Sequence, residues 1–174
     1  MKKFILTDET IEMFGVTLHR IKAVRSFGYV KEGDLGGFVE KEENISENFE
    51  AWVYGDAKVY GDAKVYGDAK VWGDAEVWGN AEVWGDAKVY GDAKVCGNAK
   101  VWGDADYIVF KNWWSSGRYF TWTRSNNMWS VGCFYGTGKE LIKKAYVDSE
   151  KSGREYERVV RFVESILEDE KNEK

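Results

Sequence analysis

The 174-residue sequence has no proline, one histidine and two cysteines, and each shortage excludes a class of protein. Without proline and with glycine at every sixth place of a repeat, the chain is not collagen-like. Two cysteines, Cys96 and Cys133, cannot build a disulfide scaffold. No apolar run approaches the length of a membrane span, and the first residues lack the apolar stretch of a signal peptide. We therefore expect a cytoplasmic protein that does not enter a membrane.

Positive charge is scarce as well. Lys and Arg number 25 against 30 Asp and Glu, which gives a formal net charge of -5. Proteins that bind nucleic acid without specificity obtain their affinity from clustered Lys and Arg against phosphates. We therefore do not expect non-specific nucleic-acid binding, and the 44% hydrophobic fraction argues against a disordered chain.

What the sequence has in abundance is a six-residue repeat. From Val53 the chain reads V-Y-G-D-A-K, and it keeps this frame through Asp106 with Val at the first place of nine hexads. Gly holds the third place, Asp or Asn the fourth and Ala the fifth. This period fits neither the propensities nor the 3.6-residue turn of an α-helix. It predicts a solenoid of short stacked parallel strands, with corners at the Gly-Asp or Gly-Asn pairs.

The pattern V-x-G-[DN]-A-x resembles the hexapeptide repeat of left-handed parallel β-helix proteins, in which three hexads form one triangular coil. Residues 20–27 (RIKAVRSF) and 30–39 (VKEGDLGGFV) resemble the leader of β-helix proteins common in phages and prophages. Residues 131–137 (VGCFYGT) resemble the tail module of the same group. The resemblance implies the left hand, and Val and Ala inside the coils. The resemblance says little about function, because many relatives are labelled transferases on the basis of their fold alone.

These observations predict a mainly β protein with three parts. Residues 1–38 form an N-terminal β cap, residues 39–106 a single-stranded left-handed parallel β-helix, and residues 107–174 a small β-sheet with two helices. Val39 and Ile45 are degenerate hexad starts, with two extra residues before Val53. Three strand-like runs are expected at residues 107–111, 117–124 and 128–134. The helices begin at S/T-x-x-E capping boxes, at Thr137 and Ser152. The terminal parts cap the coils, whose strand edges are otherwise unpaired.

Eighteen residues per coil place eight outward aromatic side chains in three columns on the prism. The simplest interpretation is that these rings stack on one another over the corner glycines. The alternative is that a column is covered by another subunit or stacks on a ligand, since contiguous apolar patches usually mark contacts. Together with an apolar stripe on the last helix, the rings predict a homo-oligomer, either a dimer or a trimer. In the sixth position, Glu76 and Glu82 each lie between two Lys and are expected to pair with them.

Residues for catalysis are few. β-Helix acyltransferases use a catalytic His, whereas the single histidine here, His19, lies in the leader, where a structural role is the simpler interpretation. Cys133 is expected to be a buried structural thiol in a strand, and Cys96 to replace an outward aromatic. Corner Asp side chains are expected to bind local backbone amides rather than a metal. We therefore expect no catalytic residues, no metal and no cofactor.

The asymmetric side chains of the tail strands are the predicted binding site, because nine similar hexads offer no unique patch. Trp, Tyr and Arg are enriched at binding hot spots. The simpler interpretation of Trp129 and the other tail rings is a small aromatic core, and the alternative is a platform for a nucleobase or a sugar. The turn residues are expected to have no packing role. The predicted site consists of Arg118, Tyr119, Arg124, Asn126, Asn127 and Trp129, with Trp113 and Trp114 nearby.

Three functions are consistent with these features. The first is a non-catalytic binding protein of phage or prophage origin that engages a host or phage macromolecule through a protein partner, for example as a counter-defence inhibitor. The second is a hexapeptide-repeat acyl- or nucleotidyl-transferase. The third is a protein that sequesters a small nucleotide-type ligand at sites between subunits.

Overall fold

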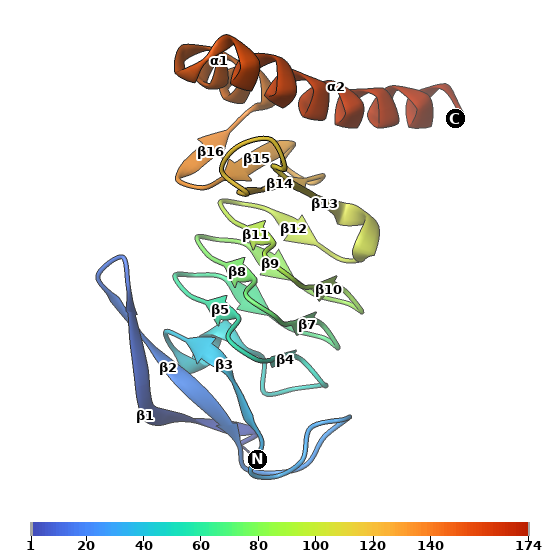
Figure 1. Ribbon diagram of the computed structural model, residues 1–174. Helices are drawn as coiled ribbons and strands as arrows, with labels where there is room; N and C mark the ends of the chain where they lie inside the picture. Colours follow the sequence, from blue (N-terminus) through green and yellow to red (C-terminus); the bar gives the residue numbers. More distant parts are fainter. Residues whose placement is uncertain (1, 174) are drawn as a thin grey trace.

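The computed structural model describes residues 2–173. It is mainly β, with a solenoid of about four turns, a C-terminal antiparallel sheet and two helices. Figure 1 shows these parts stacked along one axis, with the N-terminal strands at one end and the helices at the other. The predicted fold class is confirmed in these respects.

Each hexad forms one two-residue strand, and strands eighteen residues apart pair in parallel to make three flat faces. Val53 pairs with Val71, which pairs with Val89, so the eighteen-residue coil is confirmed. The faces are β4-β7-β10, β5-β8-β11 and β6-β9-β12. The strands are β4 (Trp52–Val53), β5 (Lys58–Val59), β6 (Lys64–Val65), β7 (Lys70–Val71), β8 (Glu76–Val77), β9 (Glu82–Val83), β10 (Lys88–Val89), β11 (Lys94–Val95) and β12 (Lys100–Val101).

The interior is filled by the Val and Ala side chains, as predicted. All nine repeat Val side chains are fully buried. At the corners the Gly residues from Gly55 to Gly97 have φ between 60° and 73°. A Cβ at Gly73 would lie 3.0 Å from the Gly91 amide nitrogen of the next coil, so both the backbone angle and the close stacking favour glycine. The pattern ends earlier than predicted: Ala105 is exposed, because residues 104–106 form a 3-10 turn that leaves the stack.

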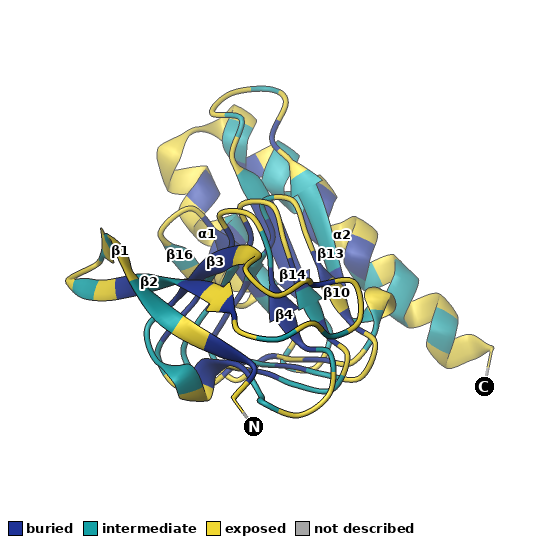
Figure 2. Ribbon diagram, turned by 90° about the horizontal axis from the view of Figure 1, so that it is seen from below, coloured by how far each residue is buried: buried dark blue, intermediate teal, exposed yellow. Residues whose placement is uncertain are grey.

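An additional first coil precedes Val53. Strand β3 (Leu35–Val39) pairs in parallel with β5, so that Val39 lies beside Val59. Ile45 forms an isolated parallel bridge to Val65. Both offsets are twenty residues, and Phe49 at φ 60° lies within the longer corner that takes up the two extra residues. The two degenerate hexads are therefore confirmed. A hairpin of β1 (Phe4–Met13) and β2 (Val16–Ala23) continues this face beyond β3, and its exposed tip projects from the body in Figure 2.

The C-terminal sheet is antiparallel in the order β13-β14-β15-β16. Its strands are β13 (Tyr107–Lys111), β14 (Tyr119–Thr123), β15 (Met128–Val131) and β16 (Phe134–Gly136). The run predicted at residues 128–134 is in fact two strands, because Gly132, at φ 59°, turns the chain.

Two helices, α1 (Gly138–Asp148) and α2 (Glu150–Asn172), cover this sheet in Figure 1. The capping box at Thr137 is confirmed. The one at Ser152 is wrong: Ser149 caps α2, and its hydroxyl accepts from the Ser152 amide at 3.0 Å. The two helices thus nearly abut. No helix among residues 2–173 is both long enough and apolar enough to cross a membrane.

Candidate functional site

The backbone polarity of the stack gives the two ends of the solenoid different chemistry. Each coil donates its amides to carbonyls of the next coil toward the C-terminus, as Lys70 does to Ala87 and Trp72 to Val89, both at 2.9 Å. The first coil is therefore left with carbonyls at its outer edge, and the last coil with amides. Unpaired backbone groups at such an edge need partners.

Donor side chains cover the carbonyl edge. Lys3 is fully buried and donates its ammonium to the carbonyls of Ser46 and Ala51, the latter at 2.8 Å. Burial lowers the pKa of Lys3 to about 8, against the opposing field of Glu47. Arg20 donates to the carbonyls of Gly36 and Gly55 at 2.9 and 3.1 Å. The buried Asn44 amide adds bonds to the carbonyls of Gly61 and Ala63.

Acceptor side chains from the C-terminal part cover most of the amide edge. The Lys94 amide donates to the Thr121 hydroxyl at 2.9 Å, and the Lys100 amide to the Ser125 hydroxyl at 2.6 Å. The Asp106 carboxylate accepts from the amides of Trp102 and Gly103 at 2.7 and 3.0 Å.

Tyr107 covers the third face. Its hydroxyl donates to the Lys88 carbonyl at 2.9 Å and lies beside the Tyr90 amide. Burial raises the pKa of Tyr107 to about 12.

The corners of the last coil are covered unequally. At Gly97, an added Cβ would lie 2.0 Å from the hydroxyl oxygen of Tyr135, which also lies beside the Asn98 amide. At Gly91, an added Cβ would meet no atom within 4 Å. No described residue accepts a hydrogen bond from the Asp92 amide, whereas the Asp74 amide one coil below donates to Gly91 at 3.0 Å. We call the cavity above Gly91 and Asp92 the open corner.

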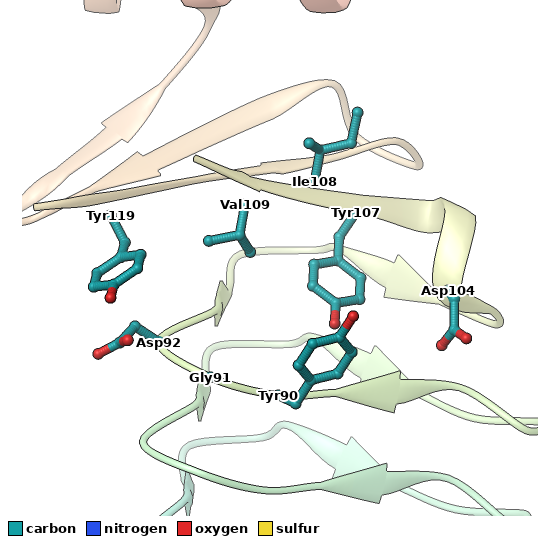
Figure 3. A pocket seen from close by; sticks show the side chains of 8 residues that line it. All are labelled: Tyr90, Gly91, Asp92, Asp104, Tyr107, Ile108, Val109 and Tyr119. Carbon is teal, nitrogen blue, oxygen red and sulfur yellow. The ribbon is translucent and has the colours of Figure 1, made fainter. Parts of the chain in front are cut away.

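The open corner has a volume of about 440 Å³ and lies between the last coil and strands β13 and β14 (Figure 3). Figure 3 shows the Tyr90 and Tyr107 hydroxyls pointing toward one another, and Tyr119 hanging over Asp92. The rings of Tyr90 and Tyr107 meet edge to face, with centroids 6.4 Å apart. The lining residues are Tyr90, Gly91, Asp92, Asp104, Tyr107, Ile108, Val109 and Tyr119.

Acidic groups in the open corner have no cationic partner within the described part of the chain. Neither Asp92 nor Asp104 belongs to any ion pair there. Asp92 is the one fourth-position residue of the nine hexads that is half-buried, because the C-terminal sheet overhangs it. The cavity is therefore lined by two carboxylates and three tyrosine rings, with the Asp92 amide unpaired among the described residues.

Of the predicted site residues, only Tyr119 lines this cavity. Trp113 is 76% exposed and Arg118 is exposed, while Trp114 is half-buried and packs against Tyr156. Trp129 is buried in the small core between the sheet and α2. The structure thus does not gather these side chains into one cluster.

The turn residues have packing roles, contrary to our expectation. Arg124 forms a two-pronged ion pair with Glu170 of α2, at 2.6 and 3.0 Å. The Asn127 side chain accepts from the Trp122 indole at 2.8 Å, and Asn126 accepts from Thr123 and donates to Tyr135. Asn127 also has φ 51°, which Asn tolerates better than most residues. These contacts lock the turn between β14 and β15.

Sequence reasoning missed Tyr90, Asp92, Asp104 and Tyr107. The first three occupy ordinary repeat positions, so their residue types carry no signal. The sequence does show that the six-residue repeat ends near Asp106. The last residue of each column therefore has no further coil stacked on it, and this could have indicated that the last coil is different.

The outward aromatics mostly stack, as the simpler interpretation predicted. Tyr60 lies over Trp78 at 5.9 Å and Tyr66 over Trp84 at 5.6 Å, both nearly parallel. Rings near the ends of columns remain more open, with Tyr90 and Trp102 each 56% exposed.

The predicted charge pairs are confirmed on one side of each Glu. Lys94 meets Glu76 at 3.1 Å, and Lys100 meets Glu82 at 3.5 Å. On the other side no ion pair forms: Lys58 donates instead to the Asp56 carbonyl, and Glu82 accepts from the Tyr66 hydroxyl.

The prediction for Cys133 was wrong, whereas Cys96 does take the place of an outward aromatic. Cys133 is exposed, because it lies in the turn between β15 and β16 rather than in a strand. Cys96 faces outward but is only 3% exposed, and burial raises its pKa to about 11. His19 lies in β2, where Nδ1 is 3.1 Å from the Thr7 carbonyl across the hairpin. Among residues 2–173, no three His, Cys, Asp or Glu side chains are grouped to hold a metal.

Comparison with known proteins adds no assignment. No model of a protein family matches this sequence, and no curated protein matches it.

Proposed function

We propose that this chain is a non-catalytic binding protein that engages a protein partner at the C-terminal end of its solenoid. The observation that carries the proposal is the open corner, which is lined by three tyrosines and two aspartates and where, among the described residues, the Asp92 amide and both carboxylates have no partner. Tyr is among the residues enriched at binding hot spots.

Asymmetry supports placing the contact here. The flat faces repeat similar side chains every six residues, so a partner could bind them in several registers. The open corner combines repeat residues with Tyr107 and Tyr119 of the terminal sheet, and this combination occurs once among the described residues. Discrimination between partners requires such a unique set of contacts.

The narrower form of the proposal is a left-handed coil of phage or prophage origin, acting on a host or phage macromolecule as a counter-defence inhibitor. It is supported by the resemblance of residues 20–27, 30–39 and 131–137 to phage-type β-helix proteins. A homo-oligomer, dimer or trimer, is also part of the proposal. Trp102, which is 56% exposed and lies outside the open corner, supports it.

The other two functions have less support. The carboxylates of Asp92 and Asp104 would repel the phosphates of a nucleotide in this cavity. A transferase would need a base, and His19 lies in the N-terminal hairpin, outside the residues that line the open corner.

A capture experiment tests the proposal. Tagged full-length protein is mixed with bacterial lysate, and bound proteins are quantified for wild type and for Asp92→Arg, which fills the cavity and reverses its charge. Asp74→Arg is the matched control, one coil below in the same column and fully outside the cavity. We expect a stoichiometric partner that is lost with Asp92→Arg and kept with Asp74→Arg. Absence of any stoichiometric partner, or equal loss in both variants, would contradict the proposal.

A further inference from the structure

We propose that the open corner binds a Lys or Arg side chain presented on an extended peptide segment of the partner. This inference rests on the proposed function, and it names the chemistry of the partner at the same site.

The charges in the cavity call for a cation. Asp92 and Asp104 both line it, and no Lys or Arg is among its lining residues. Asp92 is half-buried, so a cation beside it is screened less by water than at the other corners. The overall charge of -5 also favours approach of a basic segment.

The tyrosine rings that line the open corner also favour binding of a cation. Ammonium and guanidinium groups are attracted to the faces of aromatic rings within about 6 Å. This chain already uses that contact in both of its terminal parts: for example, Lys111 Nζ lies 5.5 Å from the Tyr119 ring centre, and the Arg20 guanidinium 4.2 Å from that of Phe38. A partner cation between Tyr90 and Tyr119 would make an equivalent contact from the cavity side.

The free backbone amide is the reason for inferring a peptide rather than an isolated amine. Among the equivalent amides of the repeat, those of Asp68, Asp74 and Asn80 donate to carbonyls of the next coil at 2.9–3.0 Å, whereas those of Asp56, Asp62 and Asp86, like that of Asp92, have no acceptor among the described residues. The Asp92 amide, in the same position of its hexad, lacks that carbonyl. An extended segment that enters the cavity would supply one, in the manner of strand addition at a sheet edge. The volume of about 440 Å³ is within the range of pockets that hold a side chain and part of its backbone.

The test uses purified full-length protein and isothermal titration with blocked peptides. The probes are acetyl-Gly-Gly-Arg-Gly-Gly-amide, the same peptide with citrulline, which has nearly the shape of Arg without its charge, and ethylguanidinium. We expect the Arg peptide to bind at least about fivefold more tightly than the citrulline peptide, because the charged contact is lost. It should also bind more tightly than ethylguanidinium, which has no carbonyl for the Asp92 amide.

Matched variants locate the binding. Asp92→Asn should weaken the Arg peptide on the order of fivefold, whereas Asp74→Asn, one coil below, should leave binding unchanged. Circular dichroism of each variant confirms that it is folded. Equal affinity for Arg and citrulline peptides, or equal weakening by both variants, would overturn the inference, the second because it indicates attraction to the net charge alone.

The outcome is separable from that of the proposed function. If a partner is captured in an Asp92-dependent way but the Arg peptide does not bind, the cationic inference is wrong and the binding function stands. If the Arg peptide binds at the open corner but no partner is captured, the inference on ligand chemistry stands and the proposed partner is wrong.

Discussion

The two ends of the solenoid expose opposite kinds of backbone group and are covered by opposite kinds of side chain. At the N-terminal end the edge consists of carbonyls, and Lys3, Arg20 and Asn44 donate to them. At the C-terminal end the edge consists of amides, and Thr121, Ser125 and Asp106 accept from them. A parallel stack has a backbone direction, so donors belong at one end and acceptors at the other. The residue types of a cap therefore indicate which end it covers.

The ends also differ in completeness. At the carbonyl edge, the buried ammonium of Lys3 donates to the carbonyls of Ser46 and Ala51. The amide edge is covered by neutral hydroxyls and one carboxylate, but one corner stays open to solvent. The cavity that remains at this corner supports our proposal of a binding site at the C-terminal end.

The largest effect should come from breaking the core that connects the two ends. Val77 is fully buried at the centre of the stack, between Val59 and Val95. Val77→Asp places an unpaired charge there and should reduce the free energy of unfolding by more than about 4 kcal/mol. Urea denaturation followed by tryptophan fluorescence measures this, with the exposed Asp74→Asn as control. A change below about 1 kcal/mol would mean that the ends fold independently of the middle coils.

Removing the carbonyl cap should have the next largest effect. Lys3→Ala leaves the carbonyls of Ser46 and Ala51 without their donor and removes a buried aliphatic stem, at a cost of about 3 kcal/mol. Lys3→Met keeps most of the stem and should cost less. Thermal unfolding of the three proteins ranks them, and a Lys3→Ala variant as stable as wild type would show that the N-terminal end needs no donor.

The same lysine predicts how stability depends on pH. Its folded-state pKa of about 8 lies below the ordinary value of 10.5, so between these values the unfolded chain binds more protons. The contribution of Lys3 to the free energy of unfolding should therefore rise with pH, by about 2 kcal/mol between pH 8 and pH 10. This rise is opposed from about pH 9 by Cys96, whose pKa burial raises to about 11, and above pH 10 by Tyr66 and Tyr107, whose pKa burial raises to about 12. Urea titrations at several pH values, compared between wild type and Lys3→Met, isolate the contribution of the lysine, which the variant should lack.

The sequence predicts the repeat far better than its ends. Hexad spacing predicts the buried Val and the corner glycines, because each depends on neighbours eighteen residues away. The extra coil at Val39 and Ile45 could still be recognised from its degenerate hexads, although its offset is twenty residues. The ends depend on contacts between unrelated segments. Nothing in the repeat shows that Tyr135 covers one corner while Tyr119 only overhangs another, so Asp92 and Asp74 look alike in sequence. Local turn chemistry was also ambiguous, since both Ser149 and Ser152 could begin a helix.

The smallest effects on the free energy of unfolding are expected at the amide edge, where its covered part and the open corner should respond differently to loss of an aspartate. Asp106 accepts from two backbone amides, so Asp106→Ala should reduce the free energy of unfolding by about 1–2 kcal/mol. Asp92 accepts from none among the described residues, and Asp92→Ala should change it by less than about 0.5 kcal/mol. Urea midpoints measured with an unchanged slope give both values. Equal destabilisation by the two variants would mean that Asp92 also serves as a cap. If Asp92→Ala leaves the free energy of unfolding unchanged, the half-buried carboxylate of Asp92 has no structural role, as expected of a residue that contacts a partner.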